Sequence, residues 1–425
     1  MGLSEAVATG WRRLAALGHN AGRLGPTPAG FSVAAIRPTV PISLALGLAL
    51  AGALAVAAEA PVPAPTAAGS PAPAADPRTR AVDTRQLAGM AALLDAIADR
   101  RVVFVGESHD RYEDHLNQLA VIEGLQRRGK DLAIGMEFFQ QPYQSALDDF
   151  VSGTIDESQM LRRTQYFDRW HFDYRLYRPI LRFARDHKIP VIALNLEEEL
   201  TRRVGDVGID GLDPAERARL PAEIDRGDKA YRDRLKAAFD QHPAMQSSSF
   251  ERFLEVQVLW DEGMAERAAR YLAEHPGKTL VVLAGSGHVE RGEGIPRRLL
   301  KRVPVPSAIL LSGVDRDLEP ELADYLLFPR QVDLPPAGLL GVMLNPDGDA
   351  AGAQVQGFSD GSGAKAAGLK EGDRIVRVGA HPVAAYADVR IALVDARPGE
   401  RIPVQVTRPQ PSGEPQTLSF EVELH

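Results

Sequence analysis

The chain of 425 residues contains no cysteine. Thiol nucleophiles, disulfides, iron–sulfur clusters and a lipid anchor on an N-terminal cysteine are therefore excluded. The chain has no excess of positive charge: its 57 acidic residues outnumber its 49 Lys and Arg residues, and the net charge is -8. This balance argues against nucleic acid as a partner. Aromatic residues make up only 6% of the chain, but apolar residues reach 44%, enough for an ordinary globular core. At roughly 100–200 residues per domain, this length predicts two or three folded units.

A long uncharged segment occurs near the start of the chain, at residues 38–58. Four arginines precede it, and Ala58-Glu59-Ala60 has the form of a signal-peptidase site. Residues 1–60 are therefore predicted to be a signal peptide or, if uncleaved, an N-terminal membrane anchor. Either outcome makes the protein periplasmic or exported, and the second anchors it to the inner membrane. Contact with a membrane is expected only through this segment.

The rest of the chain divides by composition into a spacer and two domains. Residues 61–83 are rich in proline and alanine and read as a linker. Residues 84–315 are predicted to be an α/β domain, and residues 316–335 a polar linker to a small β-rich domain at 336–425. The α/β prediction is a parallel sheet covered by helices on both faces, because short apolar runs alternate with amphipathic helices. Those runs lie at 101–105, 132–136, 191–194, 279–283 and 307–311.

Polar side chains follow each of the first four predicted strands, and the third strand is followed by Asn195 and Glu197. Glu107 and His109 come after the first strand, Glu137 after the second and His288 after the fourth. Ligands of open parallel sheets bind just outside the carboxyl ends of the strands, so these side chains are expected to meet at one edge. Two imidazoles and two carboxylates suit zinc or another divalent metal. A His–Glu pair without a metal can equally act as a general base, and unrelated helix caps and polar loops remain an alternative.

The segment from residue 166 to residue 177 holds six aromatic residues with arginines between them. It is either a pair of helices packed on the sheet or the wall of a pocket for a large, flat, anionic ligand. In the second case His171, Tyr174 or Tyr177 can supply an axial ligand to haem iron, and Arg175 can pair with the carboxylates of haem.

Two further expectations concern the neighbourhood of the cluster. Asp261 or Gln257, on one predicted helix, is a candidate to orient one of the histidines. The other histidines, His115 and His187 among them, show no convergent partner and are expected to be structural or on the surface.

Six collinear blocks within residues 95–315 resemble the ChaN-like haem-binding uptake family of the Tiki/TraB/erythromycin-esterase superfamily. They include VVFVGESHD at 102–110 and GSGHVERGEGIPRRL at 285–299. The resemblance implies an α/β sandwich whose site is formed by Glu107, His109, Glu137 and His288. It also implies haem binding and a role in iron uptake. Other members of the superfamily are metal-dependent proteases or esterases, so the resemblance identifies the site better than the activity.

The C-terminal domain resembles a bacterial PDZ domain of the kind attached to HtrA-type proteases. Two segments carry this resemblance, GLLGV at 338–342 and AAGLKEGDRIVRV at 366–378. The resemblance implies that Leu339, Leu340, Gly341 and Val342 bind the C-terminal carboxylate of a partner protein while its peptide adds a strand to the sheet. The alternative is a closed domain that serves only as a spacer.

Three functions remain open from the sequence. The first is an exported haem- or metal-binding protein of haem or iron uptake, with a PDZ module for a partner's C-terminus. The second is a metal-dependent hydrolase, a protease or esterase, with Glu107, His109, Glu137 and His288 as its catalytic residues. The third is a scaffold without enzymatic activity.

Overall fold

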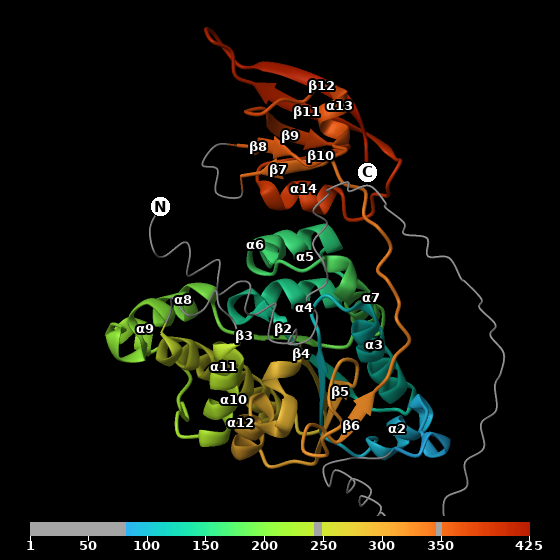
Figure 1. Ribbon diagram of the computed structural model, residues 1–425, viewed down its shortest axis with the longest axis vertical. Coiled ribbons are helices and arrows are strands. Elements are labelled where there is room, and N and C mark those ends of the chain that lie inside the picture. The colour runs from blue at the N-terminus through green and yellow to red at the C-terminus, as the bar shows by residue number, and fades with distance from the viewer. Residues whose placement is uncertain (1–81, 242–248, 346–350) are drawn as a thin grey trace, which may run out of the picture. The chain divides into compact units, whose positions relative to one another are not determined.

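Buried apolar runs form a six-stranded sheet in the computed structural model, which describes residues 82–241, 249–345 and 351–425. The strand order is β3-β2-β4-β1-β5-β6, and every described pair is parallel (Figure 1). The strands are β1 (Val102–Glu107), β2 (Leu132–Gln140), β3 (Val191–Asn195), β4 (Thr279–Gly285), β5 (Ser307–Ser312) and β6 (Tyr325–Leu327). The predicted parallel sheet is therefore confirmed. The predicted leader at 1–60, and all of the 61–83 linker except its last two residues, lie outside the described residues.

Helices cover both faces of this sheet, as predicted. They are α2 (Met90–Ala96), α3 (Tyr112–Arg127), α4 (Gln144–Ser152), α5 (Glu157–Arg163), α6 (Tyr166–Arg169), α7 (Tyr174–Asp186), α8 (Glu198–Val207), α9 (Pro214–Arg217), α10 (Lys229–Asp240), α11 (Phe250–Glu274) and α12 (Ile295–Arg302). Short 3-10 turns are η2 (Gln141–Tyr143), η3 (Ile209–Gly211), η5 (Ser286–His288) and η6 (Glu290–Gly292). No helix in the described ranges is both long and apolar enough to span a bilayer.

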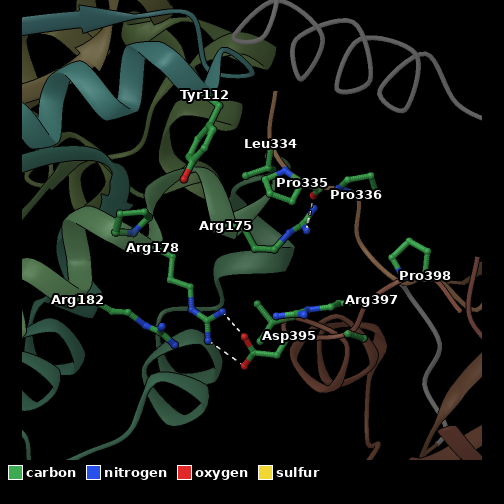
Figure 2. A pocket seen from close by; sticks show the side chains of 13 residues that line it. Tyr112, Arg175, Arg178, Arg182, Leu334, Pro335, Pro336, Asp395, Arg397 and Pro398 are labelled. Atoms are coloured by element: carbon green, nitrogen blue, oxygen red, sulfur yellow. Dashed lines mark hydrogen bonds and ion pairs between the residues drawn. The ribbon is translucent and has the colours of Figure 1, made fainter. Parts of the chain in front are cut away.

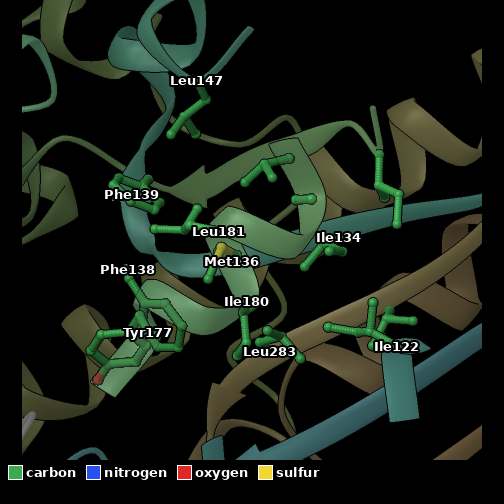
Figure 3. Close-up of a cluster of buried hydrophobic side chains, with 14 of the residues drawn as sticks. Ile122, Ile134, Met136, Phe138, Phe139, Leu147, Tyr177, Ile180, Leu181 and Leu283 are labelled. Atoms are coloured by element: carbon green, nitrogen blue, oxygen red, sulfur yellow. The ribbon is translucent and has the colours of Figure 1, made fainter. Parts of the chain in front are cut away.

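The two faces of the sheet have separate cores. Val103 and Val105 of β1 pack in a cluster with residues of α3, α4 and α7, whereas Val102 and Phe104 pack with residues of α11 and α12. Figure 3 shows part of the first cluster, where Phe138 of β2 and Tyr177 of α7 lie against each other. Because successive strand residues point to opposite faces and both faces are covered, the strands read as unbroken apolar runs.

The sixth strand lies where the sequence predicts a polar linker. β6 pairs in parallel with β5, with Tyr325 beside Leu310. All three of its residues are only partly buried, because β6 is at the edge of the sheet. A three-residue edge strand within a proline-containing segment carries too little periodicity to be recognised.

The C-terminal domain is an antiparallel sheet in the order β12-β11-β9-β8-β7, and β10 pairs with β9. Its elements are β7 (Val342–Leu344), β8 (Ala353–Phe358), α13 (Gly363–Ala367), β9 (Arg374–Val378), β10 (His381–Pro382), α14 (Tyr386–Ala392), β11 (Arg401–Arg408) and β12 (Gln416–Glu423). Residues 87–425 belong to one compact unit, whereas the 3-10 turn η1 (Thr84–Gln86) belongs to another. In that turn Asp83 accepts hydrogen bonds from Arg85.

Candidate functional site

The site begins where β1 ends, at Glu107. The carboxylate of Glu107 accepts hydrogen bonds from three side chains: His109 Nδ1 at 2.6 Å, His115 Nδ1 at 2.8 Å and Gln118 Nε2 at 3.0 Å. Glu107, His115 and Gln118 are at most 1% exposed, and His109 is 6% exposed. A buried carboxylate is tolerated here because its oxygens are surrounded by donors.

His115 and Glu107 form a buried ion pair. Burial alone would raise the pKa of Glu107, but the positive charge of His115 and the hydrogen bonds from both histidines lower it to about 2. Burial would likewise lower the pKa of His115, but Glu107 raises it. His115 Nε2 lies 3.2 Å from the carbonyl oxygen of His109, so both ring nitrogens face acceptors and both carry protons.

The expectation that His115 has no convergent partner is therefore wrong. A sequence pattern could have indicated that His115 is buried, because residues 115, 118, 122 and 125 have the spacing of one helix face. In the structure all four are buried on α3. A polar pair on an otherwise apolar helix face indicates a buried partner, and here that partner is Glu107.

A second cluster lies around His288 in η5. His288 Nδ1 donates to Asp261 Oδ1 at 2.6 Å, and its Nε2 lies 3.4 Å from Glu137 Oε1. Asp261 also accepts the hydroxyl hydrogen bond of Tyr231. Burial would lower the pKa of His288, but Glu137 and Asp261 raise it to about 9, so this imidazole is a cation at neutral pH. Asp261 is thus the one of the two predicted orienting residues that contacts a histidine of the site.

Gly285, at the end of β4, brings the two clusters together. Its N–H donates to Glu137 Oε2 at 2.7 Å. A Cβ at this position would lie 3.0 Å from His109 Nε2 and 3.6 Å from Glu137 Oε2. The structure therefore gathers Glu107, His109, Glu137 and His288 at one edge of the sheet, and glycine is needed where the imidazole approaches the backbone.

A zinc site is not supported by this arrangement. In the described ranges no group of three or more His, Asp or Glu side chains is placed to hold a metal ion. The physical reason is that His115 and His288 turn both nitrogens toward acceptors and His109 turns Nδ1 toward Glu107. Among the ring nitrogens of these three histidines, only Nε2 of His109 faces no acceptor of the cluster, so the cluster offers one imidazole nitrogen to a ligand.

The aromatic segment covers His109. The rings of Trp170 and Phe172 lie 5.0 and 4.8 Å from the His109 ring, centroid to centroid. His171, between them in the chain, is exposed. Tyr177 joins the cluster through its hydroxyl group, which donates to the carbonyl oxygen of His109 at 3.2 Å.

The other two residues predicted to contact haem lie elsewhere. Tyr174 is fully buried and donates its hydroxyl hydrogen bond to Glu157 at 2.8 Å. Burial raises the pKa values of Tyr174 and Tyr177 well above the ordinary value, which disfavours the phenolate that binds iron. Arg175 pairs with Asp173 and lines a pocket that contains none of the His/Glu cluster residues (Figure 2).

The predicted peptide-binding loop surrounds Gly341, whose φ is +75°. Leu340 is buried in the core of its domain, Leu339 is 48% exposed, and Val342 begins β7 opposite Phe358. Leu339 exchanges backbone hydrogen bonds with His425 at 3.0 and 3.1 Å. Within the described residues, the N–H groups of Leu340 and Gly341 donate to no acceptor.

Fold and site together define an α/β domain, with paired imidazoles and carboxylates at the carboxyl edge of its sheet, followed by a small antiparallel β domain. Residues 93–299 match the family described as haem-binding uptake, Tiki superfamily, ChaN, and residues 338–424 match the PDZ domain. The chain thus carries a ChaN-like domain of the Tiki superfamily and a C-terminal PDZ domain, as the sequence predicts.

Three individual proteins and solved structures that resemble this chain are at most 24% identical to it over the matched residues. The Arabidopsis thaliana protein RETICULATA-RELATED 5, chloroplastic, is 24% identical over 257 residues, which are 55% of this chain and 35% of the relative, so the match spans about a third of that relative. A solved structure of cofacial haem binding to ChaN of Campylobacter jejuni is 16% identical with a TM-score of 0.46, covering 56% of this chain and 91% of that chain. A serine endoprotease from Yersinia pestis is 24% identical with a TM-score of 0.17, covering 21% of this chain and 28% of that chain.

Proposed function

We propose that this protein binds haem at the aromatic segment beside the His/Glu cluster and serves haem or iron uptake outside the cytoplasm. The observation that carries the proposal is the ChaN-like domain at 93–299, in which aromatic rings gather around His109. The PDZ domain then holds the C-terminus of a partner protein. Export is supported by the leader-like composition of residues 1–60.

The residues of the aromatic segment fit haem at His171. This imidazole is exposed, and it stands between Trp170, which is 8% exposed, and the partly buried Phe172. Flat apolar rings beside an accessible imidazole suit a flat apolar ligand whose metal takes a nitrogen ligand. When bound, haem would supply the iron, and the chain's own residues would orient it and shield one face.

A haemin titration of the purified protein tests this proposal. A shift of the Soret band is expected, and H171A should weaken binding at least tenfold. H381A is the matched control, because His381 is also exposed but lies in the PDZ domain on β10. The absence of any haemin binding by the parent protein would refute the proposal, and equal binding by H171A would refute His171 as the ligand.

Export is tested separately. Cell fractionation followed by N-terminal sequencing should recover the protein outside the cytoplasm, with a new N-terminus near residue 61 if the leader is cleaved. Recovery of the intact chain in the cytoplasm would contradict export while leaving haem binding untouched.

Peptide binding by the PDZ domain is supported by the two N–H groups of Leu340 and Gly341, which have no acceptor in the described residues. Adjacent backbone N–H groups in a turn with positive φ form a concave site for an anion such as a terminal carboxylate. A screen of C-terminal peptides against the full chain should find ligands of micromolar affinity. Amidated controls should bind at least tenfold more weakly, because amidation removes the charge that the N–H groups hold. Equal binding of amide and acid would make the domain a spacer.

The Glu107–His109 pair favours a second candidate, a hydrolase that needs no metal. With its Nδ1–H held by Glu107, His109 keeps a lone pair on Nε2 and can act as a general base toward water. Hydrolysis of p-nitrophenyl esters in the presence of EDTA is the test. Loss of activity in H109Q, but not in H187Q, would support this candidate, whereas the same background rate in all three proteins would exclude it for these esters.

A further inference from the structure

A pocket of about 750 Å³ is lined by none of the residues of the His/Glu cluster. One wall is α7, which contributes Arg175, Arg178 and Arg182. The other walls are residues 334–336 and residues 394–398, the segment that follows α14. Figure 2 shows Arg178 facing Asp395 across this pocket, with Arg397 beside them.

Positive charge is in excess in the pocket. Four arginines line it, Arg397 included, but Asp395 is its one lining carboxylate. Asp395 pairs with Arg178 Nη2 at 3.0 Å, while Glu157, outside the lining, pairs with Arg178 and Arg182. Asp173 pairs with Arg175. Four guanidinium groups thus face three carboxylates.

Arg397 is the one of these four arginines that is not paired with a carboxylate in the described residues. In the described part of the chain its guanidinium group makes no hydrogen bond or ion pair. The hydrogen bond from Arg178 is the main cause of the lowered pKa of Asp395, and the charge of Arg397 adds to it. The Arg182 side chain is 55% exposed, so it too remains accessible to a ligand. An anion entering the pocket therefore meets two guanidinium groups that solvent can reach.

Apart from the hydroxyl group of Tyr112, the remaining lining is apolar and stiff. It consists of Tyr112, Pro179, Leu334, Pro335, Pro336, Val394, Ala396 and Pro398. Proline offers no N–H group, so these walls give a ligand apolar contact and few hydrogen bonds. The volume lies within the range of pockets that enclose ligands of a few tens of atoms.

We infer that this pocket binds a small anionic amphiphile, an alkyl chain bearing one carboxylate or phosphate. The alkyl chain lies on the proline and leucine walls, and the anionic head pairs with Arg397 and Arg182. Burying the chain supplies the apolar contribution to binding, while the guanidinium groups select for negative charge. Asp395 competes with the ligand's head for Arg178.

Isothermal titration calorimetry of the full chain tests this inference, with decanoate, decyl phosphate and decan-1-ol as probes below micelle-forming concentrations. At least one of the two anions should bind at least tenfold more tightly than decan-1-ol. The ratio of the two anion dissociation constants then tells whether the natural head group is a carboxylate or a phosphate.

Variants locate the site. R182A/R397A should weaken binding of the anion at least tenfold, and D395N should tighten it severalfold because the competing carboxylate is gone. R377A is the matched control, since Arg377 is exposed in the same PDZ domain but does not line the pocket. Equal affinity for decan-1-ol and both anions, or unchanged anion binding by R182A/R397A, would overturn the inference.

Discussion

His115 donates from Nδ1 to the carboxylate of Glu107 across 2.8 Å, and both side chains are only 1% exposed. The two residues are close in the chain but lie on different elements: Glu107 ends β1, and His115 lies in the first turn of α3. This ion pair holds Glu107 ionised and so fixes the carboxylate that orients His109. His115 therefore supports the candidate site through Glu107, although His115 does not itself line the site.

Removal of the His115 cation should be costly. H115L leaves the Glu107 carboxylate buried without its counter-charge, which is expected to lower the free energy of unfolding by about 3–5 kcal/mol. Urea denaturation measures the change. H187L is the control, because His187 is exposed at the end of α7 and its replacement should change stability by less than about 0.5 kcal/mol. An H115L variant as stable as the parent would show that the pair contributes nothing.

Stability should decline at alkaline pH because of His288. Its folded-state pKa, about 9, exceeds the ordinary value of 6.5, so its contribution is complete below pH 6.5 and is lost as the pH rises through 9. The loss should amount to at most about 3 kcal/mol, measured by urea denaturation at pH 6.5 and 9.5.

The variant D261N tests the cause of this pH dependence. Without the Asp261 charge the pKa of His288 falls, and the difference in unfolding free energy between pH 6.5 and 9.5 should shrink. D240N, which alters an exposed carboxylate on α10, should leave that difference unchanged. The same pH dependence in D261N as in the parent would contradict the assignment to His288.

Gly285 should not tolerate a methyl group. In G285A the new Cβ would lie 2.9–3.0 Å from the His109 ring, so the imidazole must move and stability should fall by about 1–3 kcal/mol. G277A is the matched control, since no atom lies within 4 Å of its added Cβ. Chemical denaturation of both variants checks the prediction, which fails if the two substitutions have equal effects.

Gly341 should be equally restricted within the PDZ domain. Gly341 and Gly361 have φ values of +75° and +73°, so alanine strains the backbone similarly at both. Only at Gly341 is the space filled, because a Cβ would lie 2.5 Å from the His425 ring and 2.7 Å from Ser362 Cα. G341A should therefore unfold at a lower temperature than G361A and lose peptide binding that G361A retains, as measured by thermal denaturation and fluorescence anisotropy. Equal peptide affinities of the two variants would exclude the Gly341 loop as the binding site.

The layered architecture could be predicted from the residue pattern, and so could the edge of the sheet at which polar residues gather. Unbroken apolar runs such as 132–136 indicate a strand buried on both faces, and a polar residue directly after such a run must lie at its carboxyl end. Glu107, Glu137 and His288 could be found in this way. The edge strand β6 could not, because three partly buried residues carry no periodic pattern.

The partners of these polar residues could not be predicted from the residue pattern, because they lie on distant segments of the chain. The pairing of Asp261 with His288 and the approach of Gly285 to His109 join segments far apart in the chain, and their geometry depends on how α11 and β4 pack. The same packing turns both nitrogens of His288 toward carboxylates, a pairing that the residue types alone do not specify. Residue types predict which atoms can donate or ligate, but the direction of each side chain, and hence its protonation, follows from contacts that no local pattern encodes.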